Sequence, residues 1–363
     1  TDDDYTKIEN DLKTYTSAYG DANYSDTYAD GKGITSDEYT KLKNKTLKSI
    51  YTYGGFYVGR YEAGTQTVRT SSSAELTTAL IQQHLYPYNY VTNAQAQSLA
   101  NGFASNLAGY ESGLMFGVQW DLVLKHMETK AVEKGEDLAT VQASLKTSSL
   151  DWGNYYDSTF TTSDKAKYST NYGSSWSQGA YTKSNPGPLI YLSTGAATKF
   201  CRQGIYDFAG NMNEYTLETY SGSETSTSVE RGSFVQALMD APAVYRWYGS
   251  PTSASIESGF RVTLIKDVDA VMPKTQTTKP YLPDGYSYKE GDLNTGLVIT
   301  DGLGNEYVWV EVPRTTGDSG VYKTAGLEIT EFTEEEYTKI ETDLKTYTSA
   351  FREEGYDDTY AEG

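Results

Sequence analysis

Apolar side chains near the start of the chain recur at the spacing of a helix. Four of them share one face of such a helix: Tyr5, Ile8, Leu12 and Tyr15. The acidic residues at positions 2–4 come just before this stripe, where they favour the positive end of the helix dipole. The pattern predicts an amphipathic helix that packs on a core. The alternative is that its stripe binds a partner.

Three more helices and a hairpin are predicted along the chain. A helix at 37–50 has Ser36 as its N-cap. Its apolar face consists of Tyr39, Leu42, Leu47 and Ile50. Thr92 or Asn93 caps a third helix. One face of a fourth consists of Trp120, Leu124 and Met127. Residues 297–312 hold a strand, a Gly-Asn turn and a second strand, which predicts a hairpin.

The first 31 residues return at the end of the chain. Residues 1–31 align without gaps with 333–363, at an offset of 332, and 20 of the 31 positions are identical. Several differences exchange Asp for Glu or Tyr for Phe, and chance does not explain such agreement. We infer that the parent protein is a tandem array with a period near this offset. The alternative is a terminal duplication.

Composition divides the chain into five segments. Residues 266–285 contain three prolines, several threonines and few large apolar side chains, which is typical of a linker. The predicted order is a helical repeat segment, a globular body, this linker, a hairpin segment and the second repeat copy, at residues 1–50, 51–265, 266–285, 286–332 and 333–363.

Net charge and the length of the apolar runs disfavour two classes of partner. The chain has 49 acidic and 30 basic residues, a net charge of −19, whereas contacts to nucleic-acid phosphates need concentrated Lys and Arg. Nucleic acid is therefore not expected, nor is membrane insertion, since no apolar run reaches the roughly 20 residues that span a bilayer. The 34 tyrosines and 33 glycines favour turns and short strands with aromatic packing. The expected fold class is α+β, irregular, with short strands and a few helices.

One cysteine and two histidines limit the chemistry. Cys201 alone forms no disulfide within the chain and no Cys-rich zinc site. His84 and His126 are too few for a three-histidine metal site, and neither has a Ser or Cys partner that suggests a triad. Each is predicted to be a surface or packing histidine.

The body carries motifs in a recognisable order. They are the strand Phe56–Glu62, the helix start Val118–Asp121, the loop Gly204–Tyr215, the turn Arg231–Phe234, the strand start Gly259–Arg261 and, last in the chain, the Val-Trp-Val strand Tyr307–Val310. These segments resemble the formylglycine-generating enzyme and sulfatase-modifying factor family, whose fold is a variant of the C-type-lectin fold. The resemblance implies that this chain has such a formylglycine-generating-enzyme-like variant of the C-type-lectin fold.

The order of the motifs differs from the family in one respect. In the family, the Val-Trp-Val strand precedes the strand that matches Phe56–Glu62, whereas here it comes last. The chain is therefore predicted to be cut out of frame. Either the hairpin folds back on its own body, as in a circular permutant, or it complements the body of a neighbouring copy through main-chain hydrogen bonds.

The resemblance also shows which positions of this chain correspond to the family's copper-binding cysteines. Its pair of copper-binding cysteines falls near Gln236 and Ala241, and neither residue ligates copper. Cys201 lies upstream of the Gly204–Tyr215 loop and is expected to be a packed, unreactive thiol. No copper is expected, and the unit is predicted to be a non-catalytic relative.

A structural calcium ion is implied in the Gly204–Tyr215 loop. The family holds it through positions that match the side chains of Asp207 and Glu214 and the carbonyls of Gly210 and Met212. Carboxylate oxygens and glycine turns suit this hard cation. The alternative is a loop without metal, in which the two carboxylates accept backbone N–H bonds.

Two arginines of the body resemble structural arginines of the family. A buried ion pair with Glu62 or Glu214 is predicted for Arg231 and Arg261.

The segment before the final Gly-Phe-Arg is a candidate binding site. C-type-lectin-like relatives that bind receptors often use this segment, which here contains Tyr245, Arg246, Trp247 and Tyr248. Aromatic residues and arginine make good anchors at an exposed site. The alternative is that Tyr245 and Trp247 pack in the core.

The preferred hypothesis is a non-catalytic structural and binding repeat unit of an extracellular fibre or cell-surface protein. Its partners are neighbouring copies of itself, joined head to tail by strand complementation. The alternative is a ligand- or glycan-binding recognition domain of an adhesin or phage tail fibre, whose partner is a host-surface protein or glycan and whose place is the virion. A third hypothesis is an oxidase or other modifying enzyme with a replaced active site.

Overall fold

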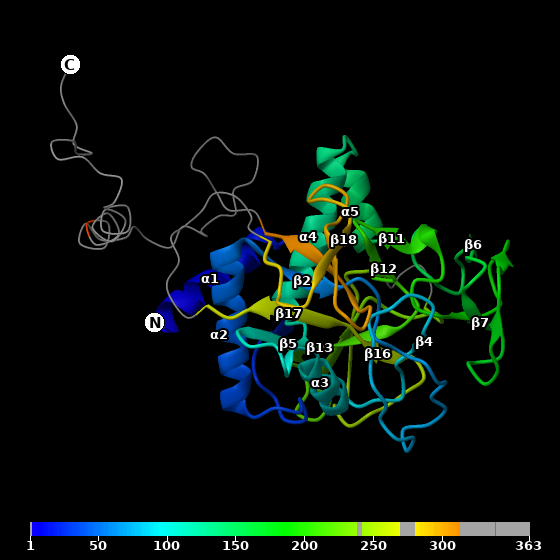
Figure 1. The fold of residues 1–363 in the computed structure, drawn as a ribbon, viewed down its shortest axis with the longest axis horizontal. Coiled ribbons are helices and arrows are strands. Elements are labelled where there is room, and N and C mark those ends of the chain that lie inside the picture. Colours follow the sequence, from blue (N-terminus) through cyan, green and yellow to red (C-terminus); the bar gives the residue numbers. More distant parts are fainter. Residues whose placement is uncertain (1, 238–241, 269–279, 313–337, 339–363) are drawn as a thin grey trace. The chain divides into compact units, whose positions relative to one another are not determined.

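The computed structural model describes residues 2–237, 242–268 and 280–312, together with Thr338. The chain divides into two compact units, Thr1–Leu327 and Glu328–Gly363. Apart from Thr338, the second repeat copy lies outside the described residues. The first unit contains both helices and strands, which makes it an α+β fold (Figure 1).

Three of the five described α-helices begin directly after a residue whose side chain accepts a backbone N–H of the first turn. The helices are α1 (Asp2–Tyr15), α2 (Ser36–Tyr53), α3 (Asn93–Asn101), α4 (Gly117–Glu133) and α5 (Leu138–Lys146), with short 3-10 helices η1 (Gly102–Ala104) and η2 (Thr198–Phe200). Thr35 and Glu38 form a capping box at α2, and Thr92 and Gln95 form one at α3. Ser36, the predicted cap, is instead the first residue of α2, because Thr35 supplies the capping hydroxyl. Within the described ranges, every helix is too short or too polar to cross a bilayer.

The apolar stripe predicted at the start of the chain faces the core. Ile8 and Leu12 are buried in α1, and Tyr5 and Tyr15 are half-buried. The helix packs on α2 and α4. The helical repeat segment therefore belongs to the same compact unit as the body.

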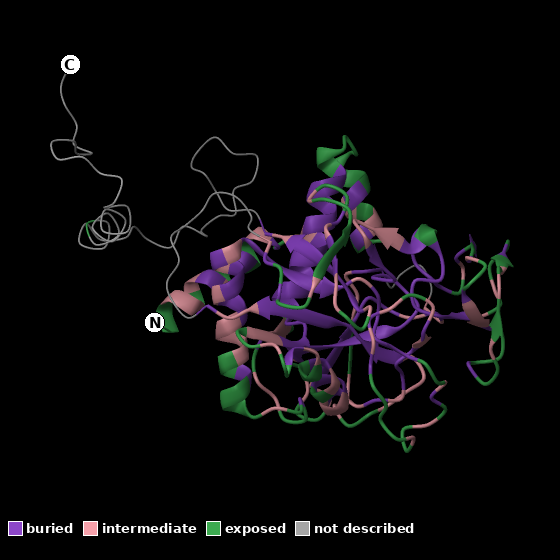
Figure 2. Ribbon diagram, in the orientation of Figure 1, coloured by how far each residue is buried: buried purple, intermediate pink, exposed green. Residues whose placement is uncertain are grey.

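A six-stranded sheet forms the centre of the unit. In spatial order its strands are β18 (Ser287–Glu290), β19 (Val298–Thr300), β20 (Glu306–Glu311), β2 (Gly55–Gly59), β17 (Val262–Lys266) and β5 (Tyr110–Leu114). All neighbouring strands are antiparallel. Every residue of β2 is buried, which explains its continuous apolar sequence, and Figure 2 shows the interior of the unit as largely buried.

The hairpin predicted between Leu297 and Val312 is formed by β19 and β20, and it pairs with β2 of the same chain. Tyr57 lies opposite Trp309, and their rings pack edge to face with 4.9 Å between centroids. Gly55 is required at the start of β2, because a Cβ there would lie 2.4 Å from the carbonyl oxygen of Val310. Of the two arrangements that the sequence left open, this structure has the pairing within one chain.

The end of the predicted linker that leads into the hairpin segment, residues 280–285, is anchored in the core. The ring of Tyr281 is buried and packs edge to face against Tyr57 and Trp309. Its hydroxyl donates to the carbonyl of Leu264 at 3.0 Å, and its own carbonyl accepts from the Tyr57 hydroxyl at 2.7 Å. The composition of residues 266–285 predicts a linker, but it does not reveal that the Tyr281 side chain anchors this segment to the six-stranded sheet.

A second sheet carries the predicted binding residues. Its strands are β1 (Tyr24–Ser25), β13 (Asn213–Tyr220), β14 (Ser228–Arg231), β15 (Arg246–Gly249) and β16 (Ser258–Phe260). The order is β1-β13-β14-β15, and β16 pairs with β13 in parallel. Strand β1 comes from the repeat segment, so this segment contributes to a sheet of the body. Strand β15 is an edge of the sheet among the described residues.

The other strands are short and lie in loop-rich parts of the body. They are β3 (Gly64–Thr65), β4 (Tyr86–Pro87), β6 (Phe160–Thr161), β7 (Lys167–Ser169), β8 (Ser177–Gln178), β9 (Thr182–Lys183), β10 (Tyr191–Leu192), β11 (Cys201–Arg202) and β12 (Ile205–Tyr206). A small apolar cluster packs among them: Phe160, Ala166, Ile190, Leu192, Ala196, Ala197 and Phe200.

Candidate functional site

The predicted binding residues Tyr245, Arg246, Trp247 and Tyr248 lie in different environments. Trp247 and Tyr248 are 50% and 44% exposed on the edge strand β15. Tyr245 is half-buried just before the strand, and Arg246 turns inward to form ion pairs. Two of the four side chains, Trp247 and Tyr248, therefore face solvent, and core packing does not hold for Trp247.

Four aromatic rings stand in a row on this sheet. Tyr248 stacks on Tyr220, with 3.9 Å between ring centroids and 16° between planes. Tyr220 lies 5.1 Å from Tyr24, and Tyr248 lies 6.4 Å from Trp247. We call Tyr24, Tyr220, Tyr248 and Trp247 the ring row. It combines flat apolar faces with phenolic hydroxyl groups.

Strand pairing brings the members of the ring row together from three parts of the chain. Tyr24 of β1 lies opposite Tyr220 of β13 in the sheet register. Tyr248 lies on β15, opposite Val229 of β14. The sequence pattern did not indicate Tyr24 or Tyr220. One signal was present, because Tyr24 is kept as Tyr356 in the second repeat copy.

Polar groups flank the ring row at Tyr24. The Asp21 carboxylate accepts hydrogen bonds from the backbone N–H of Asn23 at 2.9 Å and from its side-chain amide at 3.1 Å, and both residues are exposed. Burial, followed by the charge of Asp21, raises the pKa of Tyr24 to about 12. An acceptor and an amide thus lie beside aromatic faces, an arrangement that suits a ligand with hydroxyl groups.

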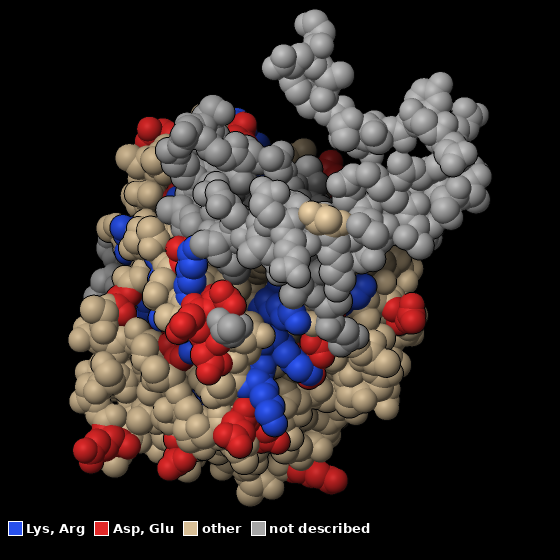
Figure 3. Space-filling view, turned by 90° about the vertical axis from the view of Figure 1, so that its left-hand side faces the viewer, with Lys and Arg blue, Asp and Glu red and all other residues tan. Residues whose placement is uncertain are grey.

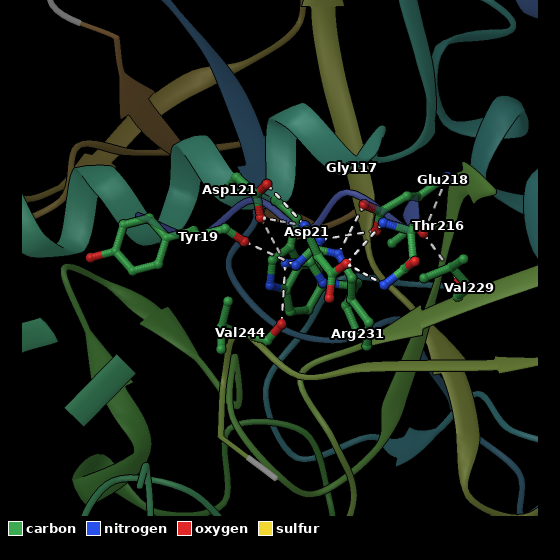
Figure 4. A network of polar contacts seen from close by, with 12 residues as sticks. Tyr19, Asp21, Gly117, Asp121, Thr216, Glu218, Val229, Arg231 and Val244 are labelled. Carbon is green, nitrogen blue, oxygen red and sulfur yellow. Dashed lines mark hydrogen bonds and ion pairs between the residues drawn. The ribbon is translucent and has the colours of Figure 1, made fainter. Parts of the chain in front are cut away.

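A buried ionic network supports this sheet (Figure 4). Arg231 donates to Asp121 at 2.7 Å and to Glu218 at 3.0 Å. Arg246 donates to the same two carboxylates, at 3.0 Å and 2.9 Å. Two guanidinium groups thus face two carboxylates away from water, and the four charges balance.

The network is tied to the repeat segment through Arg246. This arginine donates to the backbone carbonyl of Tyr19 at 2.9 Å, and its guanidinium lies 5.5 Å from the centroid of the Tyr24 ring. Gly117 leaves room for the network, because a Cβ there would lie 2.6 Å from Glu218 Oε1. Arg246 is therefore held within the network and packs against the ring row at Tyr24.

The two carboxylates of the network respond differently to burial. Burial alone raises the pKa of Glu218, but Arg231 and Arg246 outweigh it and lower the pKa below its usual value. For Asp121, burial outweighs the same arginines, and the pKa is raised. Glu218 is thus the carboxylate that the arginines hold most firmly in its charged form.

The predicted calcium ligands Asp207, Gly210, Met212 and Glu214 are all buried, but their carboxylates are already engaged. Glu214 forms an ion pair with Arg261, with contacts of 2.6 Å from Nη2 and 2.9 Å from Nε. Asp207 accepts the backbone N–H of Gly195 at 2.6 Å. In the described part of the chain, no group of three or more His, Cys, Asp or Glu is arranged to hold a metal ion. In this arrangement the two carboxylates are bound by Arg261 and by a backbone N–H, as in the alternative of a loop tied without metal, and the calcium site stays a prediction.

Arg261 is the cation of a cluster of buried acids. Glu62 accepts from the Asn211 amide at 2.7 Å and from the backbone N–H of Met212 at 3.2 Å. Burial, Asp207 and Glu214 raise the pKa of Glu62 well above its usual value, and burial raises that of Asp207 to about 7. The ion pair predicted between Arg261 and Glu214 is confirmed. Arg231 pairs instead with the acids of the other network.

The histidines and the cysteine make no catalytic arrangement in the described residues. His84 Nε2 lies 3.5 Å from the hydroxyl of Ser163, but its Nδ1 has no hydrogen-bond partner there, so a triad's third member is missing. His126 is buried and accepts the N–H of Glu311 at 3.3 Å, and burial lowers its pKa to about 3. Burial also raises the pKa of the Cys201 thiol, which disfavours the reactive thiolate.

A groove of about 440 Å³ lies between the η1 region and the hairpin. Its lining includes Leu99, Phe103 and Leu107, together with Tyr286 and Leu303. The sequence did not indicate it, because its walls come from segments about 200 residues apart.

Comparisons with known proteins give little further guidance. No protein-family model and no curated protein matches the chain. The crystal structure of CarF is 14% identical, with a TM-score of 0.30 over 51% of this chain and 68% of that chain. Treponema denticola variable protein 1 is 14% identical, with a TM-score of 0.29 over 58% of this chain and 84% of that chain. Both likenesses are too weak to indicate a fold or a function.

Proposed function

We propose that this chain is a non-catalytic binding repeat unit of an extracellular or cell-surface protein, and that its ring row binds the sugar rings of a glycan. The observation that carries the proposal is the exposure of Trp247 and Tyr248 beside the stacked Tyr220. Exposed aromatic side chains that form a continuous surface are unusual outside binding sites.

The chemistry of the ring row suits a sugar. One face of a sugar ring carries C–H groups, which pack against flat aromatic surface, while its hydroxyl groups need hydrogen-bond partners at the edge. Asp21 and Asn23 supply such partners next to Tyr24. The ionic network below fixes the strands before a ligand arrives, which lowers the ordering cost of binding. Repeated units then add avidity to a weak single site.

The proposal includes a non-catalytic, formylglycine-generating-enzyme-like variant of the C-type-lectin fold. Two contacts between the family-like motifs support it. Strand β2, which matches the Phe56 motif, pairs with β20, which matches the Val-Trp-Val motif. Arg261 of the final motif pairs with Glu214 of the central loop. Gln236 stands at one of the family's cysteine positions, and the other, Ala241, lies outside the described residues.

A glycan array tests the binding function with matched variants. The parent chain is expected to bind a subset of glycans, and Trp247→Ala and Tyr248→Ala are expected to weaken binding by about tenfold or more. Tyr172→Ala is the control, because Tyr172 is 62% exposed and outside the ring row. Equal binding by all four proteins, or no binding by the parent to glycans or host-surface proteins, would sink the proposal.

Strand complementation between copies is a second candidate, favoured by the position of β20. This strand pairs along the whole of β2, from Gly55 opposite Glu311 to Gly59 opposite Tyr307. The same register is available to β20 of a neighbouring copy. Light scattering over a wide concentration range decides between the arrangements, since a chain that stays monomeric throughout does not exchange its hairpin.

A further inference from the structure

Residues 2–31 are held on the body by contacts that exclude water. Ile8 and Leu12 are 3% and 0% exposed where α1 packs on α2 and α4. The Tyr19 hydroxyl donates to Glu128 of α4 at 2.5 Å. Figure 3 views the unit from the side of α1 and α2, where basic and acidic side chains lie close together. The body therefore carries a defined surface for this segment.

Asp26 is the most specific of these contacts. Its carboxylate oxygens accept the first N–H groups of α4, from Gly117 at 2.6 Å and Val118 at 3.0 Å. A carboxylate at a helix N-terminus satisfies donors that lack a partner within the helix. Nearby, Tyr24 pairs with Tyr220 as part of β1. The segment thus binds through an apolar stripe, a helix cap and a strand.

The second repeat copy keeps the side chains that make these contacts. The five buried residues of the first copy are Ile8, Leu12, Thr16, Tyr19 and Asp26. Their counterparts are Ile340, Leu344, Thr348, Phe351 and Asp358. Only the tyrosine changes, and phenylalanine keeps its ring. Tyr24 also recurs, as Tyr356.

The differences between the copies fall mainly where the first copy faces water. Eleven positions differ, and eight of these are exposed in the first copy. Of the 19 identical positions that the structure describes, 13 are buried or half-buried. If the second copy were only a free helix, nothing would require it to keep the residues that the first copy buries against the body. The agreement follows the surface of the body.

We propose that residues 333–363 dock on the body of a second copy of this unit, on the surface that residues 2–31 occupy here. In the present chain the first copy occupies its own body, so the acceptor is another body, in the next repeat or in another chain. The inference rests on the part of the proposed function that makes the chain a repeat unit. It joins units through a helical segment, independently of the hairpin.

Whether two chains join depends on which copy of the segment, the first or the second, is bound to the surface of a given body. The first copy is tethered beside its own body, and a short tether gives an effective concentration in the millimolar range. It therefore outcompetes the second copy of another chain, and the purified parent is expected to be monomeric. Phe351 favours the same outcome, because it lacks the hydroxyl that Tyr19 donates to Glu128.

The test opens the surface in the full chain. Leu12→Asp places a charge at a fully buried position and releases the first copy, so the variant is expected to form dimers and longer head-to-tail chains by light scattering. Adding Leu344→Asp to the same chain removes the donor and should return it to the monomer. Leu344→Asp alone is the matched control and should behave like the parent. A folded Leu12→Asp variant that stays monomeric at high concentration overturns the proposal.

A second measurement covers the case in which Leu12→Asp does not fold. A synthetic peptide of residues 333–363, added in excess, is then expected to restore a cooperative melting transition, whereas the peptide with Leu344→Asp should not. No restoration, or equal restoration by both peptides, overturns the proposal. Glycan binding by the parent chain does not depend on either result, so a failure here is distinguishable from a failure of the ring row.

Discussion

Replacing Arg261 by methionine tests whether this side chain is the cation that holds the buried acids together. The guanidinium donates to the two oxygens of Glu214 at 2.6 Å and 2.9 Å. It also donates to the backbone carbonyls of Gly59 and Tyr206, at 2.9 Å in both cases. Arg261→Met keeps an apolar stem of similar length but removes the charge. Glu214 is then a buried carboxylate without a partner.

The expected loss of stability is large, because an uncompensated charge remains inside. Removing one member of a buried ion pair costs about 3–5 kcal/mol. For a unit of this size, that corresponds to a fall in Tm on the order of 10 °C. The loss should be greater at pH 8 than at pH 5, because the buried carboxylates of the variant take up protons at the lower pH.

Thermal unfolding followed by circular dichroism measures this effect. The matched control is the double variant Arg261→Met with Glu214→Gln, in which the remaining partner is neutral. It should be more stable than Arg261→Met alone, although its second substitution removes a charged side chain too. A fall of less than about 2 °C for Arg261→Met, or a double variant less stable than the single one, would refute the reasoning.

Two further predictions concern other buried acids. Burial raises the pKa of Glu230 to about 7, although the Ser258 hydroxyl donates to its carboxylate at 2.7 Å. Because the pKa is raised in the folded state, the contribution of Glu230 to stability is fully present below the unfolded pKa of about 4.3. That contribution is lost as the pH rises through 7. Glu230→Gln should therefore gain stability relative to the parent between pH 5 and pH 8, and a constant difference in Tm would contradict this. Because the Glu214 carboxylate is already paired with Arg261, the parent chain should have the same Tm in calcium and in a chelator. If calcium raises the Tm of the parent, and Asp207→Ala abolishes that rise, the result would instead support the calcium prediction.

Local patterns predicted four of the five α-helices in the described residues and the hairpin, but not α5 or most of the short strands. The stripe of Ile8 and Leu12 identified α1, and the alternation of turn and strand residues identified the β19–β20 hairpin. Such features depend on neighbours in the sequence. The pairing partner of the hairpin did not follow from them, because it depends on β2, some 250 residues away.

The candidate site was predicted only in part for the same reason. Tyr245, Arg246, Trp247 and Tyr248 were predicted together as anchors, with core packing as the alternative for Tyr245 and Trp247. In the structure Trp247 and Tyr248 are exposed, whereas Arg246 is held by Asp121 and Glu218. Tyr220 and Tyr24 join the ring row through strand register, which no local pattern encodes. Likewise, the carboxylate of Glu214 suits calcium in the sequence, and only the fold reveals its ion pair with Arg261.

The most direct test of the account follows the emission of Trp247 while a glycan binds. All five tryptophans are described; Trp120, Trp152 and Trp309 are buried, Trp176 is half-buried, and Trp247 is 50% exposed. Acrylamide quenching of the parent should therefore report mainly on Trp247. A saturating glycan is expected to reduce this quenching, and Trp247→Phe should lose the change. Unaltered quenching under saturating glycan would show that the ligand does not cover the ring row.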